Sequence, residues 1–212
     1  AGQINVDIID PQNGPKLHIN LFGNQRSRYE ANIITNKRLN EKWSTGTLIH
    51  ASQDQHHQDS NGDGFLDAPQ KKQVNVMQRL HYYGLNWEGQ VNIHGIWDQR
   101  NGGQTHHPSL AHLEDLLTYN QSNKRLEIFG NIGYIGFKDP GRSIGFQWHA
   151  QGHEYEANYA RMANGKDRSF YTNLIYQDKF STDKHMLQTG LSMRRSVTKE
   201  GFSDFIFDRN EF

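Results

Sequence analysis

The chain has 212 residues and no cysteine, and its 23 basic side chains balance its 23 acidic ones, so the formal net charge is zero. The lack of cysteine excludes a disulfide scaffold and a thiolate metal site, and the balanced charge removes the electrostatic argument for a nucleic-acid partner. Hydrophobic residues make up 34% of the chain and aromatic residues 11%. The aromatic content argues against disorder, and no run approaches the ~20 consecutive apolar residues of a membrane-spanning helix.

Alternation of apolar and polar residues dominates the chain. In the first clear example, Val74, Val76, Leu80 and Tyr82 share one face of an extended segment and polar residues fill the other. A period of two predicts a β-strand, because successive side chains of a strand point to opposite faces. About ten strands are predicted in this way, at 2–10, 16–24, 28–37, 42–53, 72–83, 87–98, 125–137, 142–163, 168–179 and 185–196.

The predicted connections are of two kinds. Starting from 11–15, every second connection is a short turn rich in Pro, Gly, Asn and Asp, and two long polar loops, at 54–71 and 99–124, fall in the other set. In an up-and-down meander, alternate connections emerge at the same edge, so one edge carries short turns and the other long loops, as in transmembrane β-barrels. The short turns are predicted at 11–15, 36–41, 83–86, 138–142 and 180–184.

The sequence therefore predicts an all-β fold, an antiparallel up-and-down transmembrane β-barrel to which this chain contributes about ten strands. Strands of this length suit a bilayer, which takes ~9–11 tilted residues, better than a soluble sheet. Val74, Val76, Val91 and Ile93 are expected to face lipid, and Trp and Tyr residues near strand ends are expected to form an aromatic girdle. A soluble β-sandwich or β-solenoid with one solvated face is the alternative, although no repeat of fixed period supports the solenoid.

A loop at 59–67 has the spacing of a calcium-binding loop. Oxygen-bearing side chains occupy its first, third, fifth and ninth positions, and Gly64 at the sixth allows a tight bend. Gln70 replaces the bidentate Glu of an EF-hand at the twelfth position, so a weaker site, or one completed from elsewhere, is expected. The alternative is a turn without a cation. The predicted ligands of a structural calcium ion in loop 54–71 are Asp59, Asn61, Asp63, Asp67 and, through its backbone carbonyl, Phe65.

Histidines occur as the pairs His56-His57 and His106-His107, with His112 nearby, all in or beside the long loops. Imidazole ligates transition metals and haem iron, but adjacent histidines do not chelate from one strand face, so polar loop residues without a metal are the preferred interpretation. The chain has no GxSxG or HExxH motif and no phosphate-binding glycine loop. We therefore do not expect an enzyme.

These segments together resemble the barrel portion of TonB-dependent outer-membrane receptors, in the branch that includes cobalamin receptors. The resemblance rests on Asp59–Asp67 followed by Pro69, on Trp87–Gln104, and on Ser169–Tyr176, while Arg209–Phe212 resembles the start of an external loop. Members of that family have an N-terminal plug, a TonB-box segment and a barrel of about 22 strands. The resemblance implies that residues 1–212 form a partial barrel domain, a middle portion without the plug.

The resemblance further implies a receptor in the outer membrane of a Gram-negative bacterium. Such a receptor binds a scarce, bulky ligand at its external loops and imports it when TonB pulls on the plug; cobalamin is the first candidate, and haem or an iron chelate the second. The expected partners are this small molecule, TonB through the missing plug, the remaining receptor segments or an associated lipoprotein, and the lipid bilayer. A secreted, calcium-stabilised β-rich binding module is the competing hypothesis, and an outer-membrane protease or lipase is a more distant one.

Overall fold

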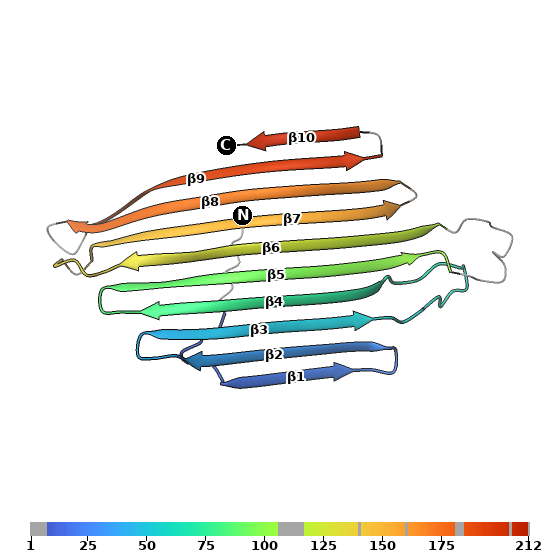
Figure 1. Cartoon of the computed structure of the whole chain (residues 1–212), viewed down its shortest axis with the longest axis horizontal. Helices are drawn as coiled ribbons and strands as arrows, with labels where there is room; N and C mark the ends of the chain where they lie inside the picture. Colours follow the sequence, from blue (N-terminus) through green and yellow to red (C-terminus); the bar gives the residue numbers. More distant parts are fainter. Residues whose placement is uncertain are drawn as a thin grey trace.

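Ten antiparallel strands form one continuous sheet in which every strand pairs with the next along the chain (Figure 1). The computed structural model describes residues 8–105, 117–139, 141–159, 161–180, 185–203 and 205–211. The all-β, up-and-down meander predicted from the alternation is therefore confirmed. The strands are β1 (Leu17–Gly23), β2 (Arg28–Arg38), β3 (Trp43–Asp54), β4 (Gln70–Tyr83), β5 (Trp87–Gly103), β6 (Thr118–Tyr134), β7 (Ser143–Tyr159), β8 (Met162–Phe180), β9 (His185–Phe202) and β10 (Phe205–Glu211).

The strand ends differ from the prediction where pairing overrides local composition. β5 and β6 remain paired as far as Gly103 and Thr118, so the predicted loop 99–124 is reduced to 104–117, and residues 106–116 lie outside the described part of the chain. Polar residues continue the ladder here because each strand satisfies the backbone groups of its neighbour. The predicted strand 142–163 is divided between β7 and β8, which pair through Asn158 and Met162.

Both ends of the chain also depart from the prediction. Of the predicted strand 2–10, residues 1–7 lie outside the described part, and residues 8–10 form no strand. Asp10 instead begins a turn, since its carbonyl accepts a hydrogen bond from the amide of Gly14 at 2.9 Å. At the other end, Arg209–Glu211 belong to β10 and pair with β9, so the expectation that an external loop starts at Arg209 is wrong.

The two long connections leave the same edge of the sheet, as predicted. Residues 55–69 join β3 to β4 and residues 104–117 join β5 to β6, and the ends of β3 and β5 from which they leave both lie at the right of Figure 1. The opposite edge carries the shorter connections 39–42, 84–86 and 135–142. Both of these edges are formed by the ends of strands and differ from the edge strands of the sheet. They are called the long-loop edge and the short-turn edge below.

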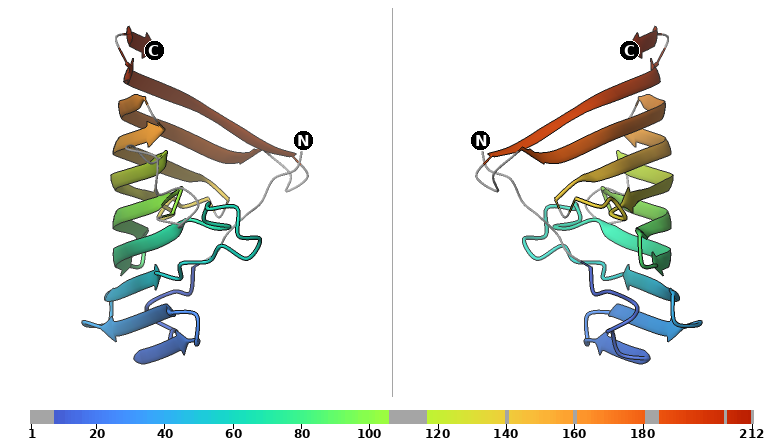
Figure 2. Two further views of the ribbon diagram at one scale, coloured as in Figure 1. Left: turned by 90° about the vertical axis from the view of Figure 1, so that its right-hand side faces the viewer. Right: turned by 90° about the vertical axis from the view of Figure 1, so that its left-hand side faces the viewer.

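The sheet is curved and open. β1 and β10 are its two edge strands and do not pair with each other among the described residues, so closure into a barrel is not part of the observed fold. Figure 2 shows residues 8–16, which precede β1, and the loop 55–69 on the concave side. Arg79 donates a hydrogen bond to the carbonyl of Ile9 in that N-terminal segment, so the side chains that share the face of Arg79 are the concave ones.

Burial is the reverse of that in a soluble sheet. In the described part of the chain, Ala157 is the one hydrophobic residue that is buried, whereas Arg79, Asn92 and Glu127 are buried polar residues. Many large apolar side chains are exposed, among them Leu126 at 63%. No second layer covers the convex face in the described part of the chain, so a closed β-sandwich with a dry core is not what these strands form. Within the same ranges, no helix is long and apolar enough to cross a membrane.

Candidate functional site on the concave face

The predicted cation loop folds around the carboxylate of Asp59. One oxygen of that carboxylate accepts hydrogen bonds from the amides of Gly62 at 2.8 Å and Asp63 at 3.2 Å. The other oxygen accepts one from Gly64 at 2.9 Å. Gly62 and Gly64 have φ angles of 70° and 83°, which glycine adopts without steric cost. The glycines therefore let three successive amides converge on one side chain.

The remaining predicted ligands also take partners within the loop. Asp63 accepts hydrogen bonds from the side-chain amide of Asn61 at 2.8 Å and from the backbone amide of Phe65 at 2.9 Å. Asp67 accepts one from the backbone amide of Ser60 at 3.0 Å. Hydrogen bonds from the Ser60 side chain and amide hold the pKa of Asp67 below its usual value. The predicted residues are thus gathered in one compact, hydrogen-bonded loop.

This loop is held against the end of β5. Phe65 forms an isolated β-bridge with Gln104, the amide of Leu66 donates to the carbonyl of Gly103 at 2.9 Å, and the amide of Thr105 donates to the carbonyl of Gly64 at 2.7 Å. The first long loop is therefore docked on the beginning of the second.

The donor chemistry of the loop suits calcium, which binds carboxylate, amide and carbonyl oxygens. In the described part of the chain, however, no three His, Cys, Asp or Glu side chains are arranged to hold a metal. Calcium at Asp59–Asp67 therefore stays a prediction. His56 and His57 belong to no such group, and His106, His107 and His112 lie outside the described residues.

A hydrogen-bonded network centred on Glu127 crosses four strands of the concave face. One oxygen of this buried carboxylate lies 2.6 Å from Nδ1 of His94, and the other lies 3.0 Å from Nε2 of His149 and 2.6 Å from a guanidinium nitrogen of Arg125. Nε2 of His94 lies 2.6 Å from the side-chain oxygen of Asn75. The register brings these residues from β4, β5, β6 and β7 into contact, although they span more than seventy positions of the sequence.

A second network fastens the N-terminal segment to β4. Arg79 donates to the carbonyl of Ile9 at 2.5 Å and lies 3.1 Å from Nε2 of His81. Nδ1 of His81 lies 3.2 Å from the hydroxyl oxygen of Tyr83, and that hydroxyl donates to the carboxylate of Asp10 at 2.7 Å. Arg79 and His81 are both buried. Because a buried charge costs free energy unless it is paired, this chain of partners stabilises the segment over the concave face.

A third group lies on β7, β8 and β9. The carboxylate of Asp167 accepts hydrogen bonds from Gln151 at 3.2 Å, Ser196 at 3.2 Å and Thr198 at 2.9 Å. Together the three networks place hydrogen-bonded polar side chains on the concave face from β4 to β9.

The sequence analysis found the polar face but not these networks. His149 and His153 lie four residues apart in the sequence, a spacing that places them on one face of a strand. This spacing predicts that both imidazoles lie on the same face of β7. The partners in the network remain invisible without the register, because Glu127 is 33 residues from His94.

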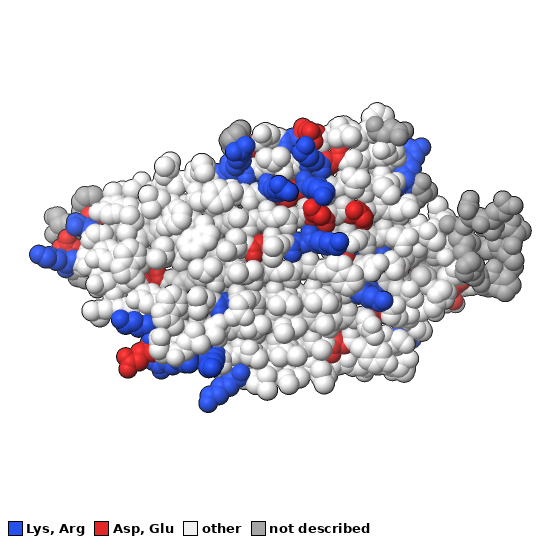
Figure 3. All heavy atoms as spheres, viewed as in Figure 1, with Lys and Arg blue, Asp and Glu red and all other residues white. Residues whose placement is uncertain are grey.

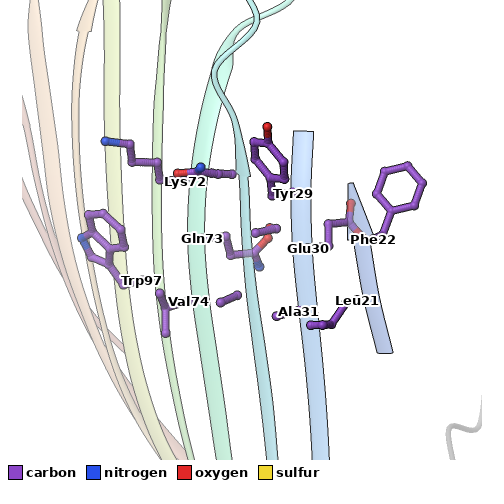
Figure 4. Close-up of a pocket in the computed structure, with 12 residues that line it drawn as sticks. Leu21, Phe22, Tyr29, Glu30, Ala31, Lys72, Gln73, Val74 and Trp97 are labelled. Carbon is purple, nitrogen blue, oxygen red and sulfur yellow. The ribbon is translucent and has the colours of Figure 1, made fainter. Parts of the chain in front are cut away.

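The convex face is apolar and carries shallow hollows. Figure 3 shows it as a broad area largely without charge, with charged side chains gathered over β6 to β10 and at the lower left, by the turn between β2 and β3. A hollow of about 550 Å³ lies over β1 to β5, and Figure 4 shows Trp97, Val74 and Lys72 beside it with Tyr29 and Leu21.

Comparisons with known proteins do not add to these observations. No protein-family model, curated protein or solved structure matches the chain.

Proposed function

We propose that this chain forms part of the wall of an outer-membrane transport β-barrel, with its convex face in lipid and its concave face along an aqueous lumen. The observation that supports the proposal best is the apolar band of the convex face. On β8, Arg168 and Asp178 both face outward and are ten residues apart, and the outward residues between them carry no charge. Ten residues match the ~9–11 that a tilted strand needs to cross the hydrocarbon. The apolar band consists of the outward-facing residues within 74–82, 87–97, 126–134, 144–152 and 170–176.

The border of the apolar band shifts from strand to strand. Lys124 on β6 pairs with Glu154 on β7, and these are the first charged outward residues of their strands toward the long-loop edge. On β8 the residue opposite Glu154 is Lys166. The outward charge that borders the band there is Arg168, which lies two residues nearer the middle of the band than Lys166. On β9 it is Arg195, again two residues nearer the middle. A progressive shift of this kind is expected where strands are inclined to the membrane plane, as they are in barrels.

Aromatic pairs border the band toward the short-turn edge. The rings of Trp43 and Tyr82 lie 4.8 Å apart, and those of Trp87 and Tyr134 lie 4.7 Å apart. Amphipathic aromatic rings are enriched at membrane interfaces, where one part of the ring is apolar and the other is hydrated. These pairs support an aromatic girdle at this border.

The concave face has the chemistry of a barrel lumen. Its networks around Glu127, Arg79 and Asp167 keep polar groups hydrogen-bonded, and a water-filled interior tolerates such groups. The competing secreted module is less well supported, because a single open sheet leaves its apolar face exposed to water.

The more specific proposal is that the transport barrel is a TonB-dependent receptor in the outer membrane of a Gram-negative bacterium. It rests on the sequence resemblance and on the two long loops at one edge, where a ligand would first bind. Cobalamin is the proposed ligand, and an iron chelate or haem is the alternative. The TonB-dependent step is tested with the complete receptor that would contain this chain, expressed in cells that lack their own: uptake of radiolabelled cobalamin should cease when the proton gradient is collapsed. Uptake that is indifferent to the gradient would exclude energised transport.

Membrane insertion is tested by two adjacent residues of β8. Leu174 faces outward near the middle of the band, and Asn173 faces the lumen at the same depth. Leu174→Arg should impair insertion, because a cationic side chain on the lipid face near the midplane costs roughly 2–4 kcal/mol, whereas Asn173→Arg should insert normally. Outer-membrane fractionation with a heat-modifiable gel band measures both variants. Equal insertion of the two variants, or protein soluble without detergent, would contradict the proposal.

A further inference from the structure

A row of charged side chains crosses the convex face at the border of the apolar band. The register places Lys124 opposite Glu154, Glu154 opposite Lys166, Lys166 opposite Lys199, and Lys199 opposite Asp208, so the row runs from β6 to β10. Two ion pairs form within it, Glu154 with Lys166 at 3.0 Å and Lys199 with Asp208 at 3.6 Å. These charges form the group visible over β6 to β10 in Figure 3.

Positive charge is in excess at the β6–β8 end of the row. Lys124 and Arg168 both act electrostatically on Glu154 in addition to its partner Lys166. Neither Lys124 nor Arg168 forms an ion pair of its own within the described ranges. Three exposed cations, Lys124, Lys166 and Arg168, therefore lie around Glu154, and Glu156 is the next outward carboxylate on β7 toward the long-loop edge.

A hollow of about 550 Å³ adjoins these cations. Lys124, Lys166 and Arg168 line one side of it together with Glu154, the partner of Lys166, and apolar residues line the other. A Cβ atom added at Gly95 or Gly152 would meet no atom within 4 Å, so the space above these glycines is open. The apolar lining includes Val74, Val76, Trp97 and Leu126.

The apolar surface continues beyond this hollow. Val74 and Trp97 also line the neighbouring hollow of Figure 4, in which Lys72 is the single cation. The cationic end and the apolar end are thus joined in one surface, with three cations over β6 to β8 and one at the other hollow. Such an arrangement fits a molecule with an anionic head and hydrocarbon chains.

We propose that this hollow binds a lipid that carries a phosphate headgroup. The phosphate accepts charge-assisted hydrogen bonds from Lys124, Lys166 and Arg168, and the acyl chains pack on Val76 and Leu126. The inference rests on the proposed function, because it requires the convex face to lie in a bilayer. The apolar lining favours a lipid over free phosphate, which would gain nothing from Val76 or Leu126.

The test measures lipid selectivity of the full chain, purified in detergent and reconstituted in phosphatidylcholine vesicles. Spin-labelled phosphatidic acid and spin-labelled phosphatidylcholine are added separately, and electron paramagnetic resonance gives the fraction of each that is immobilised by the protein. Wild-type protein should prefer phosphatidic acid by roughly tenfold. A triple variant with Lys124→Gln, Lys166→Gln and Arg168→Gln should lose the preference.

The control is Lys37→Gln, which removes an outward-facing cation near the short-turn edge and should keep the preference. An equal immobilised fraction for the two lipids in wild-type protein, or an equal loss in Lys37→Gln, would overturn the proposal. Displacement of the labelled phosphatidic acid by inorganic phosphate alone would likewise overturn it. Heat-modifiability of every variant is measured in parallel: failure of wild-type insertion refutes the proposed function, whereas normal insertion without lipid selectivity refutes only this inference.

Discussion

Glu127 and His94 lie opposite each other on β6 and β5, with a carboxylate oxygen 2.6 Å from Nδ1 of the imidazole. The same carboxylate contacts His149 on β7, so a single buried side chain joins three strands of the concave face. A buried hydrogen-bonding group that loses its partner costs more than the hydrogen bond itself contributes. The network is therefore expected to stabilise the sheet from its concave side.

Glu127→Gln should lower the free energy of unfolding by about 1–3 kcal/mol, because it removes the charge shared by two histidines and Arg125. Urea unfolding in detergent, followed by tryptophan fluorescence, measures the change. The matched control is Glu154→Gln on the convex face, whose ion pair with Lys166 is exposed and is expected to contribute only ~0–1 kcal/mol. If both variants lose the same free energy of unfolding, the buried Glu127 network stabilises the sheet no more than an exposed ion pair does.

Arg79→Met should release the N-terminal segment from the concave face. The substitution keeps an apolar stem and removes the donor to the Ile9 carbonyl, so the free energy of local opening should fall by about 1–3 kcal/mol. Trypsin cleavage after Lys16, followed by mass spectrometry, measures the opening. Arg38→Met removes an exposed arginine near the short-turn edge and should leave the cleavage rate unchanged; a rate in Arg79→Met equal to that in wild type would contradict the anchoring role.

Asp63→Ala should abolish any protection of the loop 55–69 by calcium. The reason is that Asp63 supplies one of the predicted oxygen ligands and also organises Asn61 and Phe65. Limited proteolysis in calcium and in chelator measures the protection, and Asp139→Ala, which removes an exposed carboxylate from the other edge, should retain it. Identical cleavage of wild-type protein in calcium and in chelator would show that this loop does not bind calcium.

The hydrogen bonds from Ser60 predict an acid-sensitive loop. They hold the pKa of Asp67 below its usual value of 3.8. Because the folded-state pKa is the lower one, the stabilisation is complete above pH 3.8 and is lost as the pH falls through the folded-state pKa. A carbon NMR titration of the Asp67 carboxyl measures this pKa directly, and Ser60→Ala should raise it. An Asp67 that titrates at or above 3.8 in wild-type protein would show that the Ser60 bonds do not form.

The alternation in the sequence determined the two faces of the sheet. Val74 and Val76 on one side and Asn75 on the other already define a strand with an apolar and a polar face, because side-chain direction in a strand depends only on whether positions are odd or even. The order of turns and loops likewise placed both long loops at one edge. These properties follow from neighbours in the chain and need no knowledge of the sheet.

Only the tertiary structure decided which side chains meet across strands. Lys124, Glu154 and Lys166 form one row, and His94 meets Glu127, because the register of hydrogen bonds aligns particular residues of neighbouring strands. A change of register by two residues would keep every side chain on its face and give each a different neighbour. The loop at Asp59–Asp67 was visible as a motif, but its docking on Gly103 and Thr105 depends on where β5 ends, which pairing with β6 decides. Local periodicity therefore determined which face each residue occupies, and long-range pairing determined the sites on those faces.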